Sequence, residues 1–255
     1  MSLVVHQFPC LNDNYGFLVH DTESGATATI DTPDAEAINA ALATQGWSLT
    51  HILNTHHHFD HAGGNQALKE RWGCTVIGAA ADATRIPGID HEVVENDDVA
   101  IGSLHAQVFD VPGHTSGHIA YYFAADDVIF VGDTLFALGC GRLFEGTPQQ
   151  MWASLSKINA LPEHTKVYCA HEYTQANAQF ALSVEPDNPK LQARVVEIER
   201  LRSAGQPTVP TVLSLEQETN PFLRPDSAEL QAVLGMVGAD HVDVFAETRR
   251  RKDQF

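Results

Sequence analysis

The sequence predicts a mixed α/β domain followed by a small helical domain. Short apolar runs rich in β-branched residues fill the first two-thirds of the chain, and segments with helix-capping residues lie between them. Strand-like runs largely vanish after His171. With 255 residues the chain is long enough to bury a core. We therefore expect an α/β domain over residues 1–171 and a helical domain over residues 172–255.

The apolar runs are expected to form strands because they are short and rich in β-branched residues. A further run of this kind, residues 167–170, ends at His171. The main runs span residues 3–8, 16–20, 26–30, 50–53, 75–77, 104–111, 118–123 and 128–131.

Helix starts are indicated by capping residues. Thr32 followed by Pro33 predicts a cap with proline at the first helical position. Residues 147–150 have the capping-box pattern ahead of a second helix. Beyond His171 helices are expected over residues 175–182, 189–204, 228–236 and 241–250, and residues 226–229 supply a cap for the third.

Metal-ligand side chains are concentrated between Thr55 and Gly64, a segment with four histidines and one aspartate. His56 and His58 are two apart, so both imidazoles point the same way if they continue the strand before them. Asp60 and His61 follow where the strand gives way to a turn or helix, so they can face a second ion. His57 is expected to face away from the ligands and to support them.

A solvated histidine-rich loop is the alternative interpretation of this segment. Two features favour a built metal site. An apolar strand precedes the histidines, and Gly63 and Gly64 follow them, where small residues permit close backbone approach. Further ligand-type residues, His114, Asp133 and His171, lie at or near the ends of other predicted strands. His118 is ambiguous and is left out of the ligand set.

These residues and their spacing resemble the metallo-beta-lactamase superfamily, and the fuller set resembles glyoxalase II, the hydroxyacylglutathione hydrolases. The resemblance covers essentially the whole chain. It implies a four-layer αββα sandwich followed by a small all-helical domain that binds glutathione. Besides the ligands it rests on residues 139–142, 171–174 and 220–222 and on the closing basic segment 249–255.

The resemblance also implies the metal ligands. The first ion is expected on His56, His58 and His114, and the second on Asp60, His61 and His171. Asp133 is expected to bridge the two ions. Imidazole nitrogen and carboxylate oxygen suit borderline divalent ions, so we expect two zinc ions, with iron or manganese as alternatives.

The implied reaction is hydrolysis of S-D-lactoylglutathione, and of other 2-hydroxyacylglutathione thioesters, to D-lactate and glutathione. This is the second step of methylglyoxal detoxification. A metal-bridging hydroxide is the expected nucleophile, because metal binding brings the pKa of water to about 7. Asp60 and Asp133 are the expected catalytic side chains, and Asp60 is also placed to steer the proton of the hydroxide.

Contacts to glutathione are implied in the same way. Arg249 and Lys252 match the residues that hold the glycine carboxylate, and Tyr173 matches a tyrosine that contacts the tripeptide backbone. Arg142 occupies a position that is commonly lysine, and Phe144 one that is commonly tyrosine in animal relatives, which removes a hydroxyl. The alternative for the basic tail is a solvated helix end, because cations favour helix C-termini.

Composition limits the other function classes. The formal net charge of −18 argues against a nucleic-acid partner and a nuclease. No stretch approaches the roughly 20 apolar residues that span a bilayer, and the start lacks the pattern of a secretory signal, so we expect no membrane partner and a cytoplasmic location. The missing signal also argues against a beta-lactamase. The working expectation for the oligomeric state is a monomer.

The four cysteines, Cys10, Cys74, Cys140 and Cys169, are widely scattered and are expected to be reduced and structural. Two other functions stay open. An iron-dependent persulfide dioxygenase has a similar fold and takes a glutathione derivative, although the helical tail after residue 172 favours the hydrolase. A metal-binding or glutathione-sensing module without turnover is disfavoured, because complete open metal sites usually do chemistry.

Overall fold

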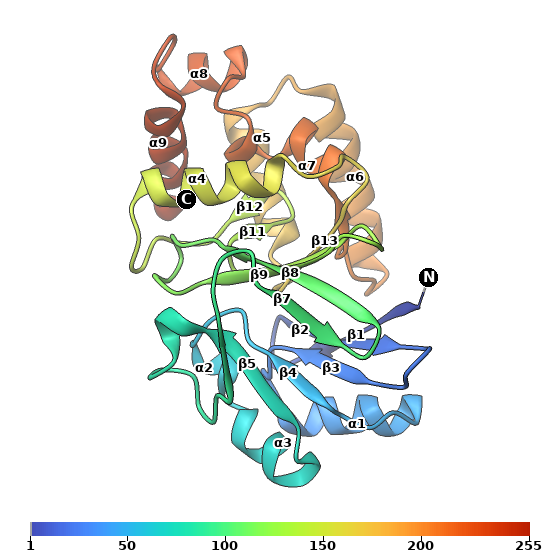
Figure 1. Ribbon diagram of the computed structural model, residues 1–255. Coiled ribbons are helices and arrows are strands. Elements are labelled where there is room, and N and C mark those ends of the chain that lie inside the picture. The colour runs from blue at the N-terminus through green and yellow to red at the C-terminus, as the bar shows by residue number, and fades with distance from the viewer. Residues whose placement is uncertain (1) are drawn as a thin grey trace. The chain divides into compact units, whose positions relative to one another are not determined.

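The structure, a computed structural model, describes residues 2–255 and divides into two compact units (Figure 1). Unit 1 runs to Asp110 and also contains Ser116–Gly132. Unit 2 consists of Val111–Thr115 and Asp133–Phe255. The short excursion of Val111–Thr115 into unit 2 gives that unit His114 in addition to the C-terminal half of the chain.

The first sheet of unit 1 has six strands in chain order. Its first three strands are antiparallel, and the remaining pairings are parallel. The carboxyl ends of the parallel strands share one edge, and the residues after β3 and β4 emerge there. The strands are β1 (Leu3–Cys10), β2 (Asn14–Asp21), β3 (Thr27–Ile30), β4 (His51–Leu53), β5 (Thr75–Ala79) and β6 (His91–Val93).

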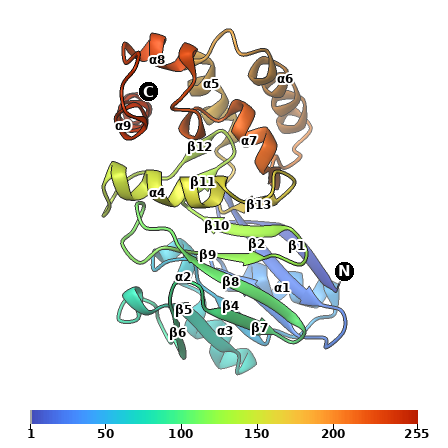
Figure 2. The same ribbon diagram turned by 45° about the horizontal axis from the view of Figure 1, so that its top comes forward.

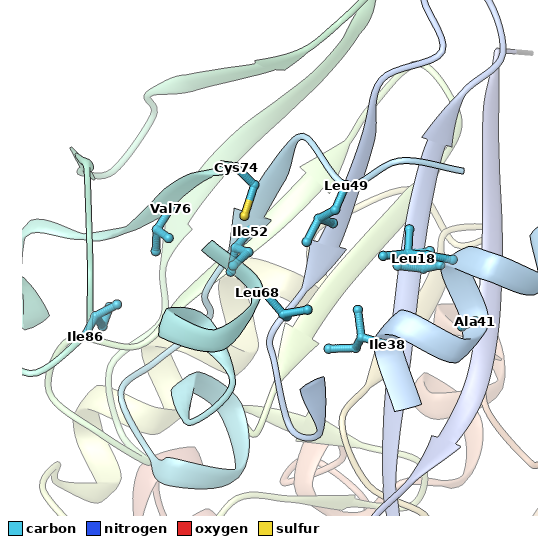
Figure 3. Packing of buried hydrophobic residues seen from close by; sticks show 10 residues of the cluster. Leu18, Ile38, Ala41, Leu49, Ile52, Leu68, Cys74, Val76 and Ile86 are labelled. Atoms are coloured by element: carbon cyan, nitrogen blue, oxygen red, sulfur yellow. The ribbon is translucent and has the colours of Figure 1, made fainter. Parts of the chain in front are cut away.

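Two helices, α1 (Ala35–Gln45) and α3 (Asn65–Trp72), cover one face of this sheet. Figure 3 shows Ile38 of α1 and Leu68 of α3 packed with Leu18 and Ile52 of the strands, and all four are fully buried. Burying such a side chain contributes about 1.5–3 kcal/mol, so this layer is a main source of the stability of unit 1.

Helix α1 does not begin where the sequence predicted. Asp34 is its N-cap, and its carboxylate accepts hydrogen bonds from the backbone N–H groups of Glu36 and Ala37. Pro33 thus precedes the cap, and the predicted cap at Thr32 is wrong by two residues. Thr32 is used elsewhere, because its backbone N–H donates to the carbonyl of His61.

The second sheet of unit 1 is antiparallel and faces the first (Figure 2). Phe17 of the first sheet contacts Phe130 of the second with ring centroids 5.5 Å apart. Tyr121, fully buried, donates from its hydroxyl to the carbonyl of Asn54 at 3.0 Å. Its strands in unit 1 are β7 (Asp98–Ile101), β8 (Leu104–Asp110), β9 (Ile119–Phe123) and β10 (Val128–Gly132). Unit 1 also contains two short helices, α2 (Phe59–Ala62) and η1 (Ala80–Asp82), which lie between strands of the first sheet in the sequence.

Unit 2 is mostly helical. Its aromatic core includes Phe180, Phe222 and Phe245, whose rings lie 5.9 and 6.1 Å apart in successive pairs. The capping box at Thr147 and Gln150 is confirmed, since each side chain bonds the backbone N–H of the other residue. The helices are α4 (Pro148–Asn159), α5 (Thr174–Val184), α6 (Pro189–Ser203), α7 (Leu213–Thr219), η2 (Pro221–Leu223), α8 (Ala228–Leu234) and α9 (His241–Gln254).

Two short strand pairs complete unit 2. The hairpin of β11 (Leu135–Phe136) and β12 (Gly139–Cys140) follows Asp133, and β13 (Lys166–Cys169) pairs antiparallel with β14 (Thr211–Val212). The sequence did not indicate β14, because two residues are too few for an alternating pattern, and it did not indicate the seven-residue helix α7 that follows. Throughout residues 2–255, no helix is long and apolar enough to cross a membrane.

Candidate metal centre

The histidine-rich segment follows β4 closely, because β4 ends at Leu53 and the first histidine is His56. Nε2 of His56 lies 3.0 Å from Nδ1 of His58, so these two ring nitrogens face the same point, as their spacing predicted. His57 lies between them and places its Nδ1 3.0 Å from the carboxylate of Asp82. The alternation of the extended backbone therefore separates His57 from its two neighbours.

Helix α2 starts directly after His58 and carries the next two candidate ligands. Nε2 of His61 is 3.6 Å from Oδ2 of Asp60, and the rings of His61 and His56 lie 4.0 Å apart. Gly63 follows, where a Cβ atom would lie 2.5 Å from the carbonyl oxygen of Phe59. The backbone and ring of Phe59 therefore leave no room for a side chain at position 63, where α2 ends.

Asp31, which the sequence analysis missed, orients His61. It is buried directly after β3, and its Oδ2 lies 2.8 Å from Nδ1 of His61. The same carboxylate accepts from the backbone N–H and the hydroxyl of Thr55, at 2.7 and 2.8 Å. A carboxylate can only accept here, so we assign the proton of His61 to Nδ1, which makes Nε2 the metal-binding nitrogen. Asn14, also missed, donates to Oδ2 of Asp60 at 3.1 Å.

Unit 2 holds the other three candidate ligands. Asp133 follows β10 and directs its two carboxylate oxygens at two different histidines. Oδ2 lies 3.4 Å from Nε2 of His114, and Oδ1 lies 3.4 Å from Nε2 of His171. Nδ1 of His114 donates to the carbonyl of Arg142 at 2.9 Å, so its Nε2 is again the nitrogen for a metal. All three side chains are buried.

Ligand atoms within 4.8 Å of one another form three overlapping groups. These groups are His56, His58 and His114; His56, His61 and Asp133; and Asp60, His61 and His171. Imidazole nitrogens and carboxylate oxygens in such groups are ligands that zinc, iron and manganese accept. The donor set therefore fits a divalent metal ion.

Two of the predicted glutathione contacts lie against candidate ligands in unit 2. The ring of Phe144 meets the ring of His114 edge-on at 5.1 Å, and the ring of Tyr173 stacks on that of His171 at 4.8 Å. Both aromatic residues are exposed. Both exposed rings thus lie directly against candidate metal ligands.

The three cationic residues differ in exposure. The side chain of Arg142 is largely exposed, that of Lys252 is half-buried, and that of Arg249 is buried. Nζ of Lys252 donates to the carbonyl of Ala176 at 3.2 Å and lies over the rings of Phe180 and Phe255. Burial, together with the charges of Arg249 and Arg142, lowers the pKa of Lys252 from 10.5 to about 8.

The lowered pKa predicts a pH dependence. Below pH 8 Lys252 is charged and can bind a carboxylate, and above pH 8 it becomes neutral. Because kcat/KM reports the groups of the free enzyme, we expect kcat/KM to fall as the pH rises through about 8. In Lys252→Arg, which stays charged, this fall should disappear. Identical pH profiles of kcat/KM for wild type and Lys252→Arg between pH 7 and 10 would contradict the role of Lys252 in binding a carboxylate. A difference of about one pH unit between the two profiles is large enough to decide.

The cysteines are free and buried, as expected for structural thiols. Burial raises the pKa of Cys140 to about 11 and that of Cys169 to about 12. The thiolate is the nucleophilic form, so neither side chain is suited to attack a substrate near neutral pH.

Comparisons with known proteins agree with this geometry. Residues 25–171 match the family model described as "Metallo-beta-lactamase superfamily", and residues 172–255 match "Hydroxyacylglutathione hydrolase C-terminus". A hydroxyacylglutathione hydrolase of Maricaulis maris is 57% identical over 254 residues, covering 100% of this chain and 99% of the relative. The family predicted from the sequence is confirmed.

Solved structures support the fold. ETHE1 from Myxococcus xanthus is 26% identical, with a TM-score of 0.68 and 98% of each chain covered. TTHA1623, solved in a di-iron-bound form, is also 26% identical, with a TM-score of 0.62 over 86% of this chain and 100% of that one. The predicted metallo-beta-lactamase fold with a helical C-terminal region is thus confirmed. The chain belongs to the hydroxyacylglutathione hydrolase family.

Proposed function

We propose that the protein hydrolyses glutathione thioesters of 2-hydroxy acids, with S-D-lactoylglutathione as the main substrate and D-lactate and glutathione as products. One observation carries the chemistry. The carboxylate of Asp133 faces His114 with one oxygen and His171 with the other, as a group that bridges two ions would. Full-length similarity to a hydroxyacylglutathione hydrolase supports the substrate.

We further propose two ions per chain. His56, His58 and His114 would hold the first, Asp60, His61 and His171 the second, and Asp133 would bridge them. The three ligand groups support this assignment, and so does the di-iron form of TTHA1623. The donor set suits zinc best, with iron or manganese as alternatives.

Divalent ions at these ligands would supply a nucleophile from water near neutral pH and polarise the thioester carbonyl. The protein would orient the reaction. Asp60, held by Asn14, is placed to accept a proton next to His61. Asp31 and the Arg142 carbonyl would fix the rings of His61 and His114, so that the ligands need not rearrange when substrate binds.

The substrate would be bound by residues of unit 2. Lys252 and Arg142 carry the charges that suit the carboxylates of glutathione. Tyr173 would contact the peptide backbone, and Phe144 would offer an apolar surface in place of a hydroxyl. Arg249 is the exception among the predicted contacts, because its guanidinium is buried and already bonded within the protein. We propose residues 172–255 as the glutathione-binding domain.

A test combines elemental analysis with a substrate panel. The purified protein, supplied in turn with zinc, iron and manganese, is assayed for loss of thioester absorbance with S-D-lactoylglutathione and other glutathione thioesters. Oxygen uptake with glutathione persulfide serves as the control for the dioxygenase alternative. Oxygen consumption without thioester hydrolysis would reject the proposed function.

We also propose a cytoplasmic location and a monomer. The free thiols fit a reducing compartment such as the cytoplasm, and size-exclusion chromatography tests the oligomeric state.

Lys252→Ala is expected to raise KM about 10- to 100-fold, because a hydrogen bond to a charged group contributes about 1.5–3 kcal/mol. Metal content should stay at the wild-type value, since the substitution removes remote binding and leaves the ligands intact. Steady-state kinetics and elemental analysis measure the two effects. Unaltered KM would mean that Lys252 does not contact the substrate.

A further inference from the structure

We infer that Asp82 is a positioning residue for the candidate metal ligands His56 and His58. Its carboxylate fixes the ring of His57 and the backbone at Gly117, and each of these neighbours lies next to a ligand. The inference rests on the proposed function only in taking His56 and His58 as ligands. The sequence gave no signal for Asp82, because it lies 25 residues after His57.

The parallel pairing of β4 and β5 places Asp82 beside the histidine-rich segment. Leu53, at the end of β4, is paired with Ile77 of β5. Both strands run in the same direction, so the segments that follow them leave the sheet at the same edge. His57 follows β4, and Asp82 is the last residue of η1, which follows β5. The two side chains therefore meet although they are far apart in the sequence.

Asp82 is fully buried, and both of its carboxylate oxygens accept hydrogen bonds. Oδ2 lies 3.0 Å from Nδ1 of His57. Oδ1 accepts from Nε of Arg85 at 3.0 Å, and Nη2 of Arg85 bonds both this oxygen and the hydroxyl of Ser116. A carboxylate is costly to bury unless it is paired and hydrogen-bonded, so these partners determine where Asp82 lies. Because a carboxylate only accepts, we assign the proton of His57 to Nδ1.

The carboxylate of Asp82 also packs against the backbone at Gly117. A Cβ atom on Gly117 would overlap Oδ1 and Cγ of Asp82. The next residue, His118, is buried and stacks on the ring of His56, with ring centroids 4.6 Å apart and an interplanar angle of 20°. A shift of the backbone at Gly117 would therefore move the ring that lies against His56.

The ring of His57 connects Asp82 to the ligands on either side of it in the sequence. Its centroid lies 4.9 Å from that of His58 and 6.3 Å from that of His56, with the edge of one ring toward the face of the other in both pairs. The bond to Asp82 holds Nδ1 toward the carboxylate and so fixes the rotation of the ring. Without this bond, the ring of His57 would be free to turn, and both ligands would lose a fixed packing partner.

The experiment measures zinc retention by the full-length protein without substrate. Zinc release from the zinc-loaded protein to a chromophoric chelator, zinc content after dialysis and the unfolding temperature of the metal-free protein are compared for wild type, Asp82→Ala, His57→Phe and the double variant. Phenylalanine keeps a ring beside His58 but lacks Nδ1, so it removes the same hydrogen bond from the other side. Asp21→Ala is the matched control, because Asp21 is also fully buried in unit 1 and accepts hydrogen bonds from two serines.

Asp82→Ala and His57→Phe are each expected to release zinc about tenfold faster than wild type, which is the lower end of the effect of losing a group that orients metal ligands. The double variant should release zinc at the rate of Asp82→Ala, because both substitutions break the same link and their effects do not add. Asp21→Ala should retain zinc like wild type, even though its metal-free form unfolds at a lower temperature.

Wild-type zinc release in Asp82→Ala would overturn the inference. Release about 100-fold faster in the double variant would do the same, because it would show two independent effects. Fast zinc release from Asp21→Ala would also overturn it, since loss of any buried carboxylate would then suffice. If Asp82→Ala does not fold, zinc release from His57→Phe decides. A wild-type protein that hydrolyses no thioester rejects the proposed function, and zinc release still decides the inference. A wild-type protein that binds no zinc would overturn the inference together with the ligand assignment.

Discussion

Asp133→Ala is expected to lower kcat/KM by at least about 100-fold, because loss of a bridging ligand should exceed the about 10- to 100-fold cost of losing an outer supporting group. If the chain holds the two zinc ions proposed above, bound zinc should fall from about two ions per chain to about one or fewer. The reason is local. The two oxygens of Asp133 face His114 and His171, so removing the carboxylate would take a ligand from each of the two proposed ions and would leave their mutual repulsion less screened.

Elemental analysis and steady-state kinetics on the same preparation measure both effects. Asp133→Asn keeps the volume but leaves a single acceptor oxygen, so it should retain more zinc than the alanine variant. Asp226→Ala, which removes an exposed carboxylate from the same unit, is the matched control and should behave like wild type. Full zinc content and wild-type turnover in Asp133→Ala would rule out the bridging role.

The position of ligands at strand ends could be predicted because apolar runs mark strands reliably. Asp133 follows β10 and His171 lies just beyond β13, as their runs indicated. The same rule would have found Asp31, which follows β3 as Asp133 follows β10. It was missed because a single aspartate lacks the neighbouring histidines that drew attention to the other segments. A polar residue directly after any predicted strand is therefore worth considering.

The local sequence pattern could not predict features that depend on contacts with residues far away in the chain. Thr32 and Asp34 are both good capping residues, and Asp34 caps α1 because Thr32 already bonds His61 and Asn65. Likewise, helical periodicity indicates that one face of α9 is buried but not what it meets. Arg249 reaches a carbonyl 109 residues earlier in the chain. The basic segment 249–255 thus looked like one functional group in sequence, whereas its cations have different surroundings.

Gly141→Ala should have the second largest effect, since the added methyl group has no space. Its Cβ would overlap the carbonyl oxygen of Asp133 and crowd Nδ1 of His114. Backbone at the far side is restrained by Arg249, so the segment cannot simply retreat. We expect faster zinc release and a fall in kcat of about 10- to 100-fold, the cost typical of misplaced metal ligands.

Stopped-flow zinc release and kcat measure this prediction, and the unfolding temperature of the metal-free protein separates a local shift from general loss of structure. Gly238→Ala is the control, because its Cβ would meet nothing within 4 Å and any effect there reflects only the positive φ of 78°. A Gly141→Ala protein with wild-type zinc retention would mean that residues 140–142 can move without disturbing His114 and Asp133. The backbone contact would then be a packing feature, and the ligands would be held from the strands alone.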